Sequence, residues 1–272
     1  GSGIAALAAS AGVPVVLLDV PGDSERNGPA RRGIERALGA RPPGFLAPEM
    51  ATLVTPGNTE DDLELLRDCD WVIEAIVELP EPKRELFARL EATLAPGTIV
   101  SSNTSGIPIA SLCEGRSASF QESFLGTHFF NPVRFLHLLE IIPTAATGSE
   151  ALNAVRNFSQ TVLGKGVVIA KDVPGFIANR LGLYGLFHTL RLMQSFDLSI
   201  DEVDALTGVL VGRPKSATFR TADIAGLDVL LHVSSELSRA TGEDFSLPEW
   251  VHNLVKRGCL GEKSGAGFYR RE

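Results

Sequence analysis

Short apolar runs rich in β-branched residues recur through the first two thirds of the chain. They lie at Val13–Leu18, Trp71–Val77, Thr98–Ser101, Leu125–Phe130, Leu138–Ile142 and Val167–Ala170. Stretches with helical spacing separate the first several runs. Strands that are apolar along their whole length are typical of a mostly parallel sheet covered by helices on both faces. We therefore predict an α/β domain over residues 1–172.

The pattern changes after the segment Lys171–Gly175. Apolar side chains fall at helical spacing from Phe176 to about Phe196, which predicts one long buried helix. Ser199 and Glu202 have the spacing of a capping box, so a further helix should begin there. Because no strand pattern returns, residues 173–272 are predicted to form an all-helical second domain.

Composition narrows the functional classes. A chain of 272 residues exceeds what one hydrophobic core usually serves, and no apolar run reaches the roughly 18 residues that a membrane span needs. The net charge of −8 disfavours nucleic acid as a partner. Three widely spaced cysteines show neither metal-ligand nor disulfide spacing. We expect a protein of a reducing compartment such as the cytoplasm, without a metal.

The start of the chain has features of a dinucleotide-binding unit. Gly1 opens a helix-like stretch that leads through Gly12 to an apolar run ending in Asp19. In such units a glycine-rich turn approaches the pyrophosphate, and an acid after the second strand accepts bonds from the adenine ribose, which favours NAD over NADP. Gly1 is at most the last glycine of GxGxxG, so the sequence is expected to begin inside this fingerprint. An acid without a nucleotide role remains equally open.

Two more predicted strands end in polar residues. Glu78 and Lys83 follow the run Trp71–Val77, and Ser101–Ser105 ends the next one. Ligands bind beyond the carboxyl ends of parallel strands, so both groups are candidates for a binding site. The alternatives are that Glu78 caps the following helix, that Lys83 faces solvent, and that the hydroxyl groups cap a helix.

His128 and Glu140 each interrupt an otherwise apolar run. In a hairpin centred on Arg134 they are equidistant from the turn and would face each other, with Cβ atoms roughly 4.5–5.5 Å apart. Such a pair suits alcohol oxidation, because one ring nitrogen can take a proton while the carboxylate stabilises the imidazolium. The alternative is a core histidine without chemistry. The cost of burying a charged pair favours catalysis.

Six motifs together resemble the 3-hydroxyacyl-CoA dehydrogenase family over essentially the whole chain: GSGIA, VIEAIVE, SSNTS, GTHFFNP with LLEIIP, KDVPGFIANR and GEKSGAGFYRRE. The resemblance implies a Rossmann-like domain, a helical dimerising domain, and NAD-dependent oxidation of (S)-3-hydroxyacyl-CoA in fatty-acid β-oxidation. The segment GRPKSATFRTADIAGLD is similar to the branch in which this unit begins a longer chain with a C-terminal enoyl-CoA hydratase-like domain.

The resemblance also implies roles for matching positions. His128 would be the general base and Glu140 its orienting partner, while Ser105 and Asn179 would contact the substrate near the reacting carbon. The positions implied for the cofactor are Gly1, Asp19, Glu78, Lys83, Ser105, Asn131 and Lys263.

The chain departs from the family pattern at two places. Where the family holds CoA with lysines, this sequence has a cluster of arginines between residues 26 and 41, of which Arg32 is the best match. Guanidinium groups can clamp phosphates, although a solvated helix face is the alternative. The incomplete glycine fingerprint predicts weakened NAD binding by this chain. Two further hypotheses stay open: a substrate without CoA, and a dinucleotide-binding or oligomer-forming module without catalysis.

Overall fold

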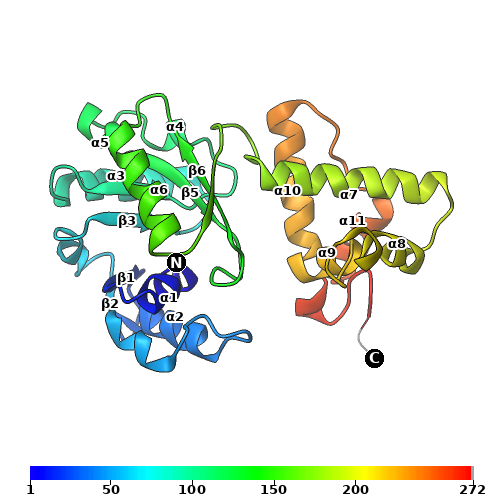
Figure 1. Cartoon of the computed structure of the whole chain (residues 1–272), viewed down its shortest axis with the longest axis horizontal. Coiled ribbons are helices and arrows are strands. Elements are labelled where there is room, and N and C mark those ends of the chain that lie inside the picture. Colours follow the sequence, from blue (N-terminus) through cyan, green and yellow to red (C-terminus); the bar gives the residue numbers. More distant parts are fainter. Residues whose placement is uncertain (271–272) are drawn as a thin grey trace. The chain divides into compact units, whose positions relative to one another are not determined.

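A computed structural model describes residues 1–270, and the chain divides into two compact units. The first unit comprises Gly1–Phe176 and the second begins at Ile177 (Figure 1). This division falls four residues after the predicted boundary at 172/173. The last two residues of the predicted second domain, 271 and 272, lie outside the described part.

Strands in the first unit form two sheets. The smaller sheet pairs β1 (Val15–Asp19) with β2 (Val54–Asn58) in parallel. The larger sheet has the order β3-β4-β5-β6-β7, and all its pairs are parallel except β5 with β6. Its strands are β3 (Trp71–Glu74), β4 (Ile99–Ser102), β5 (Phe124–Phe129), β6 (Leu138–Pro143) and β7 (Gly166–Ile169). The predicted mostly parallel sheet is confirmed.

Helices cover both faces of the larger sheet. Phe87 and Leu90 of α3 pack with Phe124 in one buried cluster, and Ile4 of α1 packs with Leu125 in another. Burial on both faces explains why these strands are apolar along their length. The helices of this unit are α1 (Ser2–Ser10), α2 (Gly28–Gly39), α3 (Pro80–Thr93), α4 (Ile109–Leu112), α5 (Ala118–Glu122) and α6 (Ser149–Thr161), with 3₁₀ turns η1 (Pro48–Leu53) and η2 (Leu63–Leu66).

Strand β2 was not predicted, because its sequence VTPGN contains two residues that are depleted in strands. Within residues 1–270, β1 is the one strand that pairs with β2, and Pro56 is tolerated because a proline can occupy such an edge strand. Gly57 is required for close approach: a Cβ atom there would lie 2.7 Å from Leu18 Cδ2 and 2.9 Å from Asp62 Oδ2. Local propensity was overridden by pairing with β1.

The second unit is helical (Figure 1). Its core joins Phe187, Phe219, Leu237 and Val251. The predicted capping box is present, because Ser199 accepts from the Glu202 amide while the Glu202 side chain accepts from Ser199. Isolated bridges at Ala266 are the departure from an all-helical domain. Its elements are α7 (Ala178–Ser195), α8 (Ile200–Thr207), η3 (Val209–Val211), α9 (Phe219–Ala225), α10 (Leu227–Thr241), α11 (Glu249–Lys256) and η4 (Glu262–Ser264).

The long helix α7 begins later than the apolar pattern indicates. Gly175 and Phe176 have φ angles of 73° and 44°, which lie in the left-handed region and interrupt any right-handed helix. The helix therefore starts at Ala178 rather than at Phe176. Within residues 1–270, none of the helices combines the length and the apolarity that a bilayer crossing requires.

Candidate active site

His128 and Glu140 face each other across the antiparallel pair of β5 and β6. The imidazole Nδ1 lies 2.7 Å from Glu140 Oε2. Both side chains are buried, with 4% of His128 and none of Glu140 exposed. The hairpin register that the sequence predicted is confirmed, and it places this pair near the carboxyl edge of the parallel strands β3, β4 and β5.

The hydrogen bond between the pair fixes the direction in which the ring can react. An ionised carboxylate can only accept, so the proton of a neutral imidazole lies on Nδ1 and the lone pair lies on Nε2. The pair therefore presents a basic nitrogen on the side of the ring away from Glu140. A hydroxyl group placed there could give up its proton.

Several neighbours hold the imidazole ring in place. The rings of Phe130 and Phe176 pack against it, with centroids 4.4 Å and 5.6 Å away. Gly126, two residues before His128, permits close packing of β5 under α4, because a Cβ atom there would lie 2.6 Å from Ile109 Cδ1. The Asn103 side chain accepts from the backbone amide of Phe129 at 2.9 Å. The strand is thus anchored on both sides of the histidine.

The polar end of β3 forms a connected network. Lys83 Nζ donates to Glu74 Oε1 at 2.7 Å and lies 3.3 Å from Glu78 Oε2. Only 1% of Lys83 is exposed, so the alternative of a solvated lysine is wrong. The helix α3 begins after Leu79 without a side-chain cap, so Glu78 does not cap it. Glu74 was not singled out from the sequence, although a carboxylate within a buried strand was the same signal that marked Glu140.

The hydroxyl groups at the end of β4 bind neighbouring strands rather than a helix terminus. Ser101 shares a hydrogen bond of 2.8 Å with Thr127 of β5, and Ser102 donates to Glu74 at 2.6 Å. The first amides of α4 instead donate to Asp172, at 2.8 Å from Ile109 and 2.9 Å from Ala110. The capping alternative is therefore wrong for Ser101 and Ser102. Asp172 is a residue that the sequence analysis missed.

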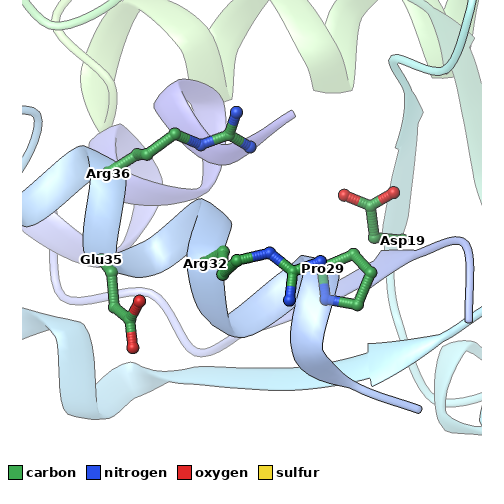
Figure 2. Close-up of a pocket in the computed structure, with 5 residues that line it drawn as sticks. All are labelled: Asp19, Pro29, Arg32, Glu35 and Arg36. Atoms are coloured by element: carbon green, nitrogen blue, oxygen red, sulfur yellow. The ribbon is translucent and has the colours of Figure 1, made fainter. Parts of the chain in front are cut away.

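Asp19 ends β1 and lines an open pocket of about 550 Å³ (Figure 2). The other lining residues come from α2 and are Pro29, Arg32, Glu35 and Arg36. Figure 2 shows Glu35 directed away from Asp19, whereas the Arg32 side chain extends toward Pro29, on the side where Asp19 lies.

The arginines of the cluster between residues 26 and 41 do not all lie at the same place in the structure. Arg26 pairs with Glu60 and Asp61 on the surface, and Arg31 pairs with Glu25. Arg32 and Arg36 line the Asp19 pocket instead. The structure thus brings the residue expected near CoA beside the acid expected near the cofactor ribose.

The remaining candidates lie apart along the chain. Gly1 precedes α1 between β1 and the end of β3, because a Cβ atom there would contact Leu17 and Ala75. Asn131 is exposed in the loop between β5 and β6. In the second unit, Asn179 lies in the first turn of α7, and Lys263 in η4 forms an ion pair with Asp228 at 2.6 Å.

A Rossmann-like sheet with an acid at the end of β1, followed by a helical domain, defines a dinucleotide-binding protein of two domains. Residues 1–173 match the NAD-binding domain of 3-hydroxyacyl-CoA dehydrogenase, and residues 175–271 match the C-terminal domain of the same enzyme. The chain belongs to the 3-hydroxyacyl-CoA dehydrogenase family, whose members are NAD-dependent oxidoreductases.

Comparison with individual proteins supports this assignment. A probable 3-hydroxyacyl-CoA dehydrogenase of Deinococcus radiodurans is 49% identical over all of this chain and 80% of its own length. A putative fatty acid oxidation complex trifunctional enzyme of Rickettsia felis is 36% identical over 99% of this chain, which spans only 39% of that protein. The crystal structure of FadB2 from M. tuberculosis superposes with a TM-score of 0.83 at 33% identity, covering 100% of this chain and 95% of FadB2.

Proposed function

We propose that this chain catalyses the NAD-dependent oxidation of (S)-3-hydroxyacyl-CoA to 3-oxoacyl-CoA in fatty-acid β-oxidation, with His128 as the general base. The observation that carries the proposal is the buried hydrogen bond of 2.7 Å between His128 and Glu140 at the edge of an NAD-binding sheet. The names of the Deinococcus and Rickettsia relatives support the substrate class and the pathway.

His128 Nε2 accepts the proton of the 3-hydroxyl group as the carbon–oxygen bond becomes a carbonyl. The bound cofactor supplies the acceptor for the hydride that leaves the same carbon. Glu140 stabilises the imidazolium that forms, because its carboxylate lies 2.7 Å from Nδ1 of the ring. In the reverse direction, the imidazolium returns its proton to the oxygen of a 3-oxoacyl group. The two aromatic neighbours Phe130 and Phe176 keep the ring in one orientation throughout.

The residues near the cofactor fit NAD. The Asp19 carboxylate is oriented by the Val20 amide, which donates to Oδ1 at 2.8 Å, and its two oxygens suit the vicinal hydroxyl groups of a ribose. A 2′-phosphate at this place would be repelled by Asp19. We assign the remaining cofactor contacts to Gly1, Glu78, Ser105 and Asn131, with Lys83 and Lys263 as further family positions.

For the substrate, we assign Ser105 and Asn179 to the groups around the reacting carbon and Arg32 to a phosphate of CoA. An acidic protein must hold an anionic tail through a local cation, and the Arg32 guanidinium lines an open pocket. A substrate without CoA would make no use of this arginine.

We also propose a homodimer and a cytoplasmic location. Helix α7 exposes Leu181, Tyr184 and Leu192, and exposed apolar side chains of this size are typical of a subunit interface. The three cysteines are free thiols, as expected in a reducing compartment. We further propose covalent fusion to a hydratase-like domain, which the similarity to a longer trifunctional enzyme of Rickettsia felis supports.

The function is tested by following NADH absorbance with acetoacetyl-CoA as substrate. The wild-type chain should oxidise NADH, and His128→Gln should lower kcat by about 10²–10⁴-fold. His137→Gln is the matched control, because His137 is exposed in the same hairpin. Binding of NAD without turnover of acetoacetyl-CoA would instead support a non-catalytic module. Equal rates for the His128→Gln variant and wild type would remove His128 as the base.

A further inference from the structure

Lys83 is held in an environment that is unfavourable for a lysine. It lies in the first turn of α3 and is fully buried. A helix N-terminus carries a partial positive charge, so a cation there is disfavoured, and burial adds a desolvation penalty. Glu74 on one side and Glu78 on the other compensate this charge. Apolar residues could fill the same volume at lower cost, so the ion pair points to a role beyond packing.

Glu74 is committed to interactions inside the protein. Its Oε1 accepts from Lys83 at 2.7 Å and from the Ile76 amide at 2.6 Å, while its Oε2 accepts from Ser102 at 2.6 Å. None of its side chain is exposed. Glu74 therefore fixes the Lys83 ammonium group and the ends of β3 and β4, and it does not face solvent or a ligand.

Glu78 is the exposed end of the same network. Its side chain is 42% exposed, in contrast to Lys83 and Glu74. Its Oε1 accepts from the Thr104 hydroxyl at 2.5 Å and from the Ser105 amide at 2.7 Å, while its Oε2 faces Lys83. The carboxylate of Glu78 thus ties the loop that carries Ser105 to the buried lysine.

The loop is also attached on its other side. The Asn103 amide donates to the backbone oxygen of Glu74 at 2.7 Å, and the Asn103 side chain accepts from the Phe129 amide at 2.9 Å. Residues 103–105 therefore lie between the Lys83 network and the strand that carries His128. A displacement of Glu78 would therefore first disturb the loop that carries Ser105, because Thr104 and Ser105 donate to its carboxylate.

We propose that Lys83 and Glu74 are positioning residues: they fix the carboxylate of Glu78, and through it the Ser105 loop, in the geometry that receives the cofactor. Lys83 acts through Glu78 and makes no independent contact with the cofactor. The proposal rests on the proposed function for the identity of that cofactor, and it changes the role that family resemblance implies for Lys83.

A double-mutant cycle distinguishes a Lys83 that acts through Glu78 from a Lys83 that contacts the cofactor directly. Isothermal titration with NAD is measured for the wild-type chain, Lys83→Met, Glu78→Gln and the double variant. If Lys83 acts through Glu78, each single change should weaken NAD binding about tenfold. The double variant should then bind NAD at least as tightly as the single variant with the lower affinity. Independent effects that multiply to about a hundredfold would overturn the proposal. Lys215→Met, which changes an exposed lysine of the second unit, should bind NAD as wild type does.

Amide hydrogen exchange of the chain without NAD gives a second measurement. In folded Lys83→Met the Ser105 amide should exchange at least about tenfold faster than in wild type, because Glu78 no longer holds it. Unchanged protection of Ser105 would overturn the proposal. Should Lys83→Met fail to fold, Glu74→Gln replaces it, because the isosteric amide can still bond to Ile76 and Ser102 while losing the charge that holds Lys83. If the wild-type chain binds NAD but does not turn over acetoacetyl-CoA, the proposed function is contradicted and the positioning role is not. The hydrogen exchange of the Ser105 amide tests the positioning role whether or not the chain is active.

Discussion

His128 and Glu140 occupy directly opposed positions on β5 and β6, and Nδ1 of the histidine lies 2.7 Å from Oε2 of the glutamate. Side chains alternate between the faces of a strand, so a register slip of one residue would separate the pair onto opposite faces. Gly126 and the bond from Phe129 to Asn103 restrict such a slip by fixing β5 against α4 and the end of β4. The catalytic proposal thus depends on strand register.

Glu140→Gln should keep the fold and lose most of the rate. An amide oxygen can still accept from Nδ1, but it has no charge with which to stabilise the imidazolium. We expect kcat to fall by about 10²–10⁴-fold while the affinity for NAD changes little. NADH-linked reduction of acetoacetyl-CoA gives kcat, and Glu150→Gln on the surface of α6 is the control. A kcat within twofold of wild type would identify the pair as a core contact without a catalytic role.

Asp19→Asn should relax the choice of cofactor. The carboxylate repels a 2′-phosphate, whereas Arg36 lines the same pocket and could pair with that phosphate once the negative charge is removed (Figure 2). We expect the ratio of kcat/KM for NADH to kcat/KM for NADPH to fall by about tenfold or more. Both constants are measured with acetoacetyl-CoA. An unchanged ratio would show that Asp19 does not contact the adenine ribose.

The sequence was sufficient for features that depend on periodicity. The β5–β6 hairpin followed from two apolar runs around Arg134, and the Ser199–Glu202 capping box followed from spacing alone. Both depend on neighbours that are close along the chain, so local pattern determines them. The apolar parallel strands of the larger sheet were also predictable, because strands buried on both faces are apolar along their length.

Tertiary contacts determine what the pattern did not show. Strand β2 contains a proline and a glycine and exists because β1 pairs with it. Asp172 caps α4 from more than 60 residues away, and the Lys83 ion pairs depend on how α3 returns over β3. No local signal separates a buried lysine from a solvated one on an amphipathic helix. The two alternatives for Lys83 could therefore be distinguished only when its partners were in place.

Arg32→Glu tests whether the protein binds its substrate through a CoA group. Reversal of the charge should raise the KM for acetoacetyl-CoA by about tenfold or more, because one charge-assisted phosphate contact is replaced by repulsion. Arg31→Glu is a matched control on the same helix, since Arg31 pairs with Glu25 and does not line the pocket. The KM for NADH is measured in parallel, because Arg32 and Asp19 share a pocket. A change confined to NADH would assign Arg32 to the cofactor, and no change in either constant would favour a substrate without CoA.

Glu202 should make the stability of the helical unit depend on pH. The backbone amide and the hydroxyl group of Ser199 both donate to this carboxylate. These hydrogen bonds, the amide's having the larger effect, lower the pKa of Glu202 below its ordinary value of 4.5. A carboxyl group with a lowered pKa in the folded state contributes stability that is complete above the unfolded pKa and is lost as pH falls through the folded pKa. Glu202→Gln should therefore lower the urea midpoint at pH 7 and have a smaller effect at pH 3. Glu249→Gln, in the first turn of α11 where no side chain caps the helix, is the control. An equal loss at both pH values would show that the Glu202 charge contributes nothing to the cap.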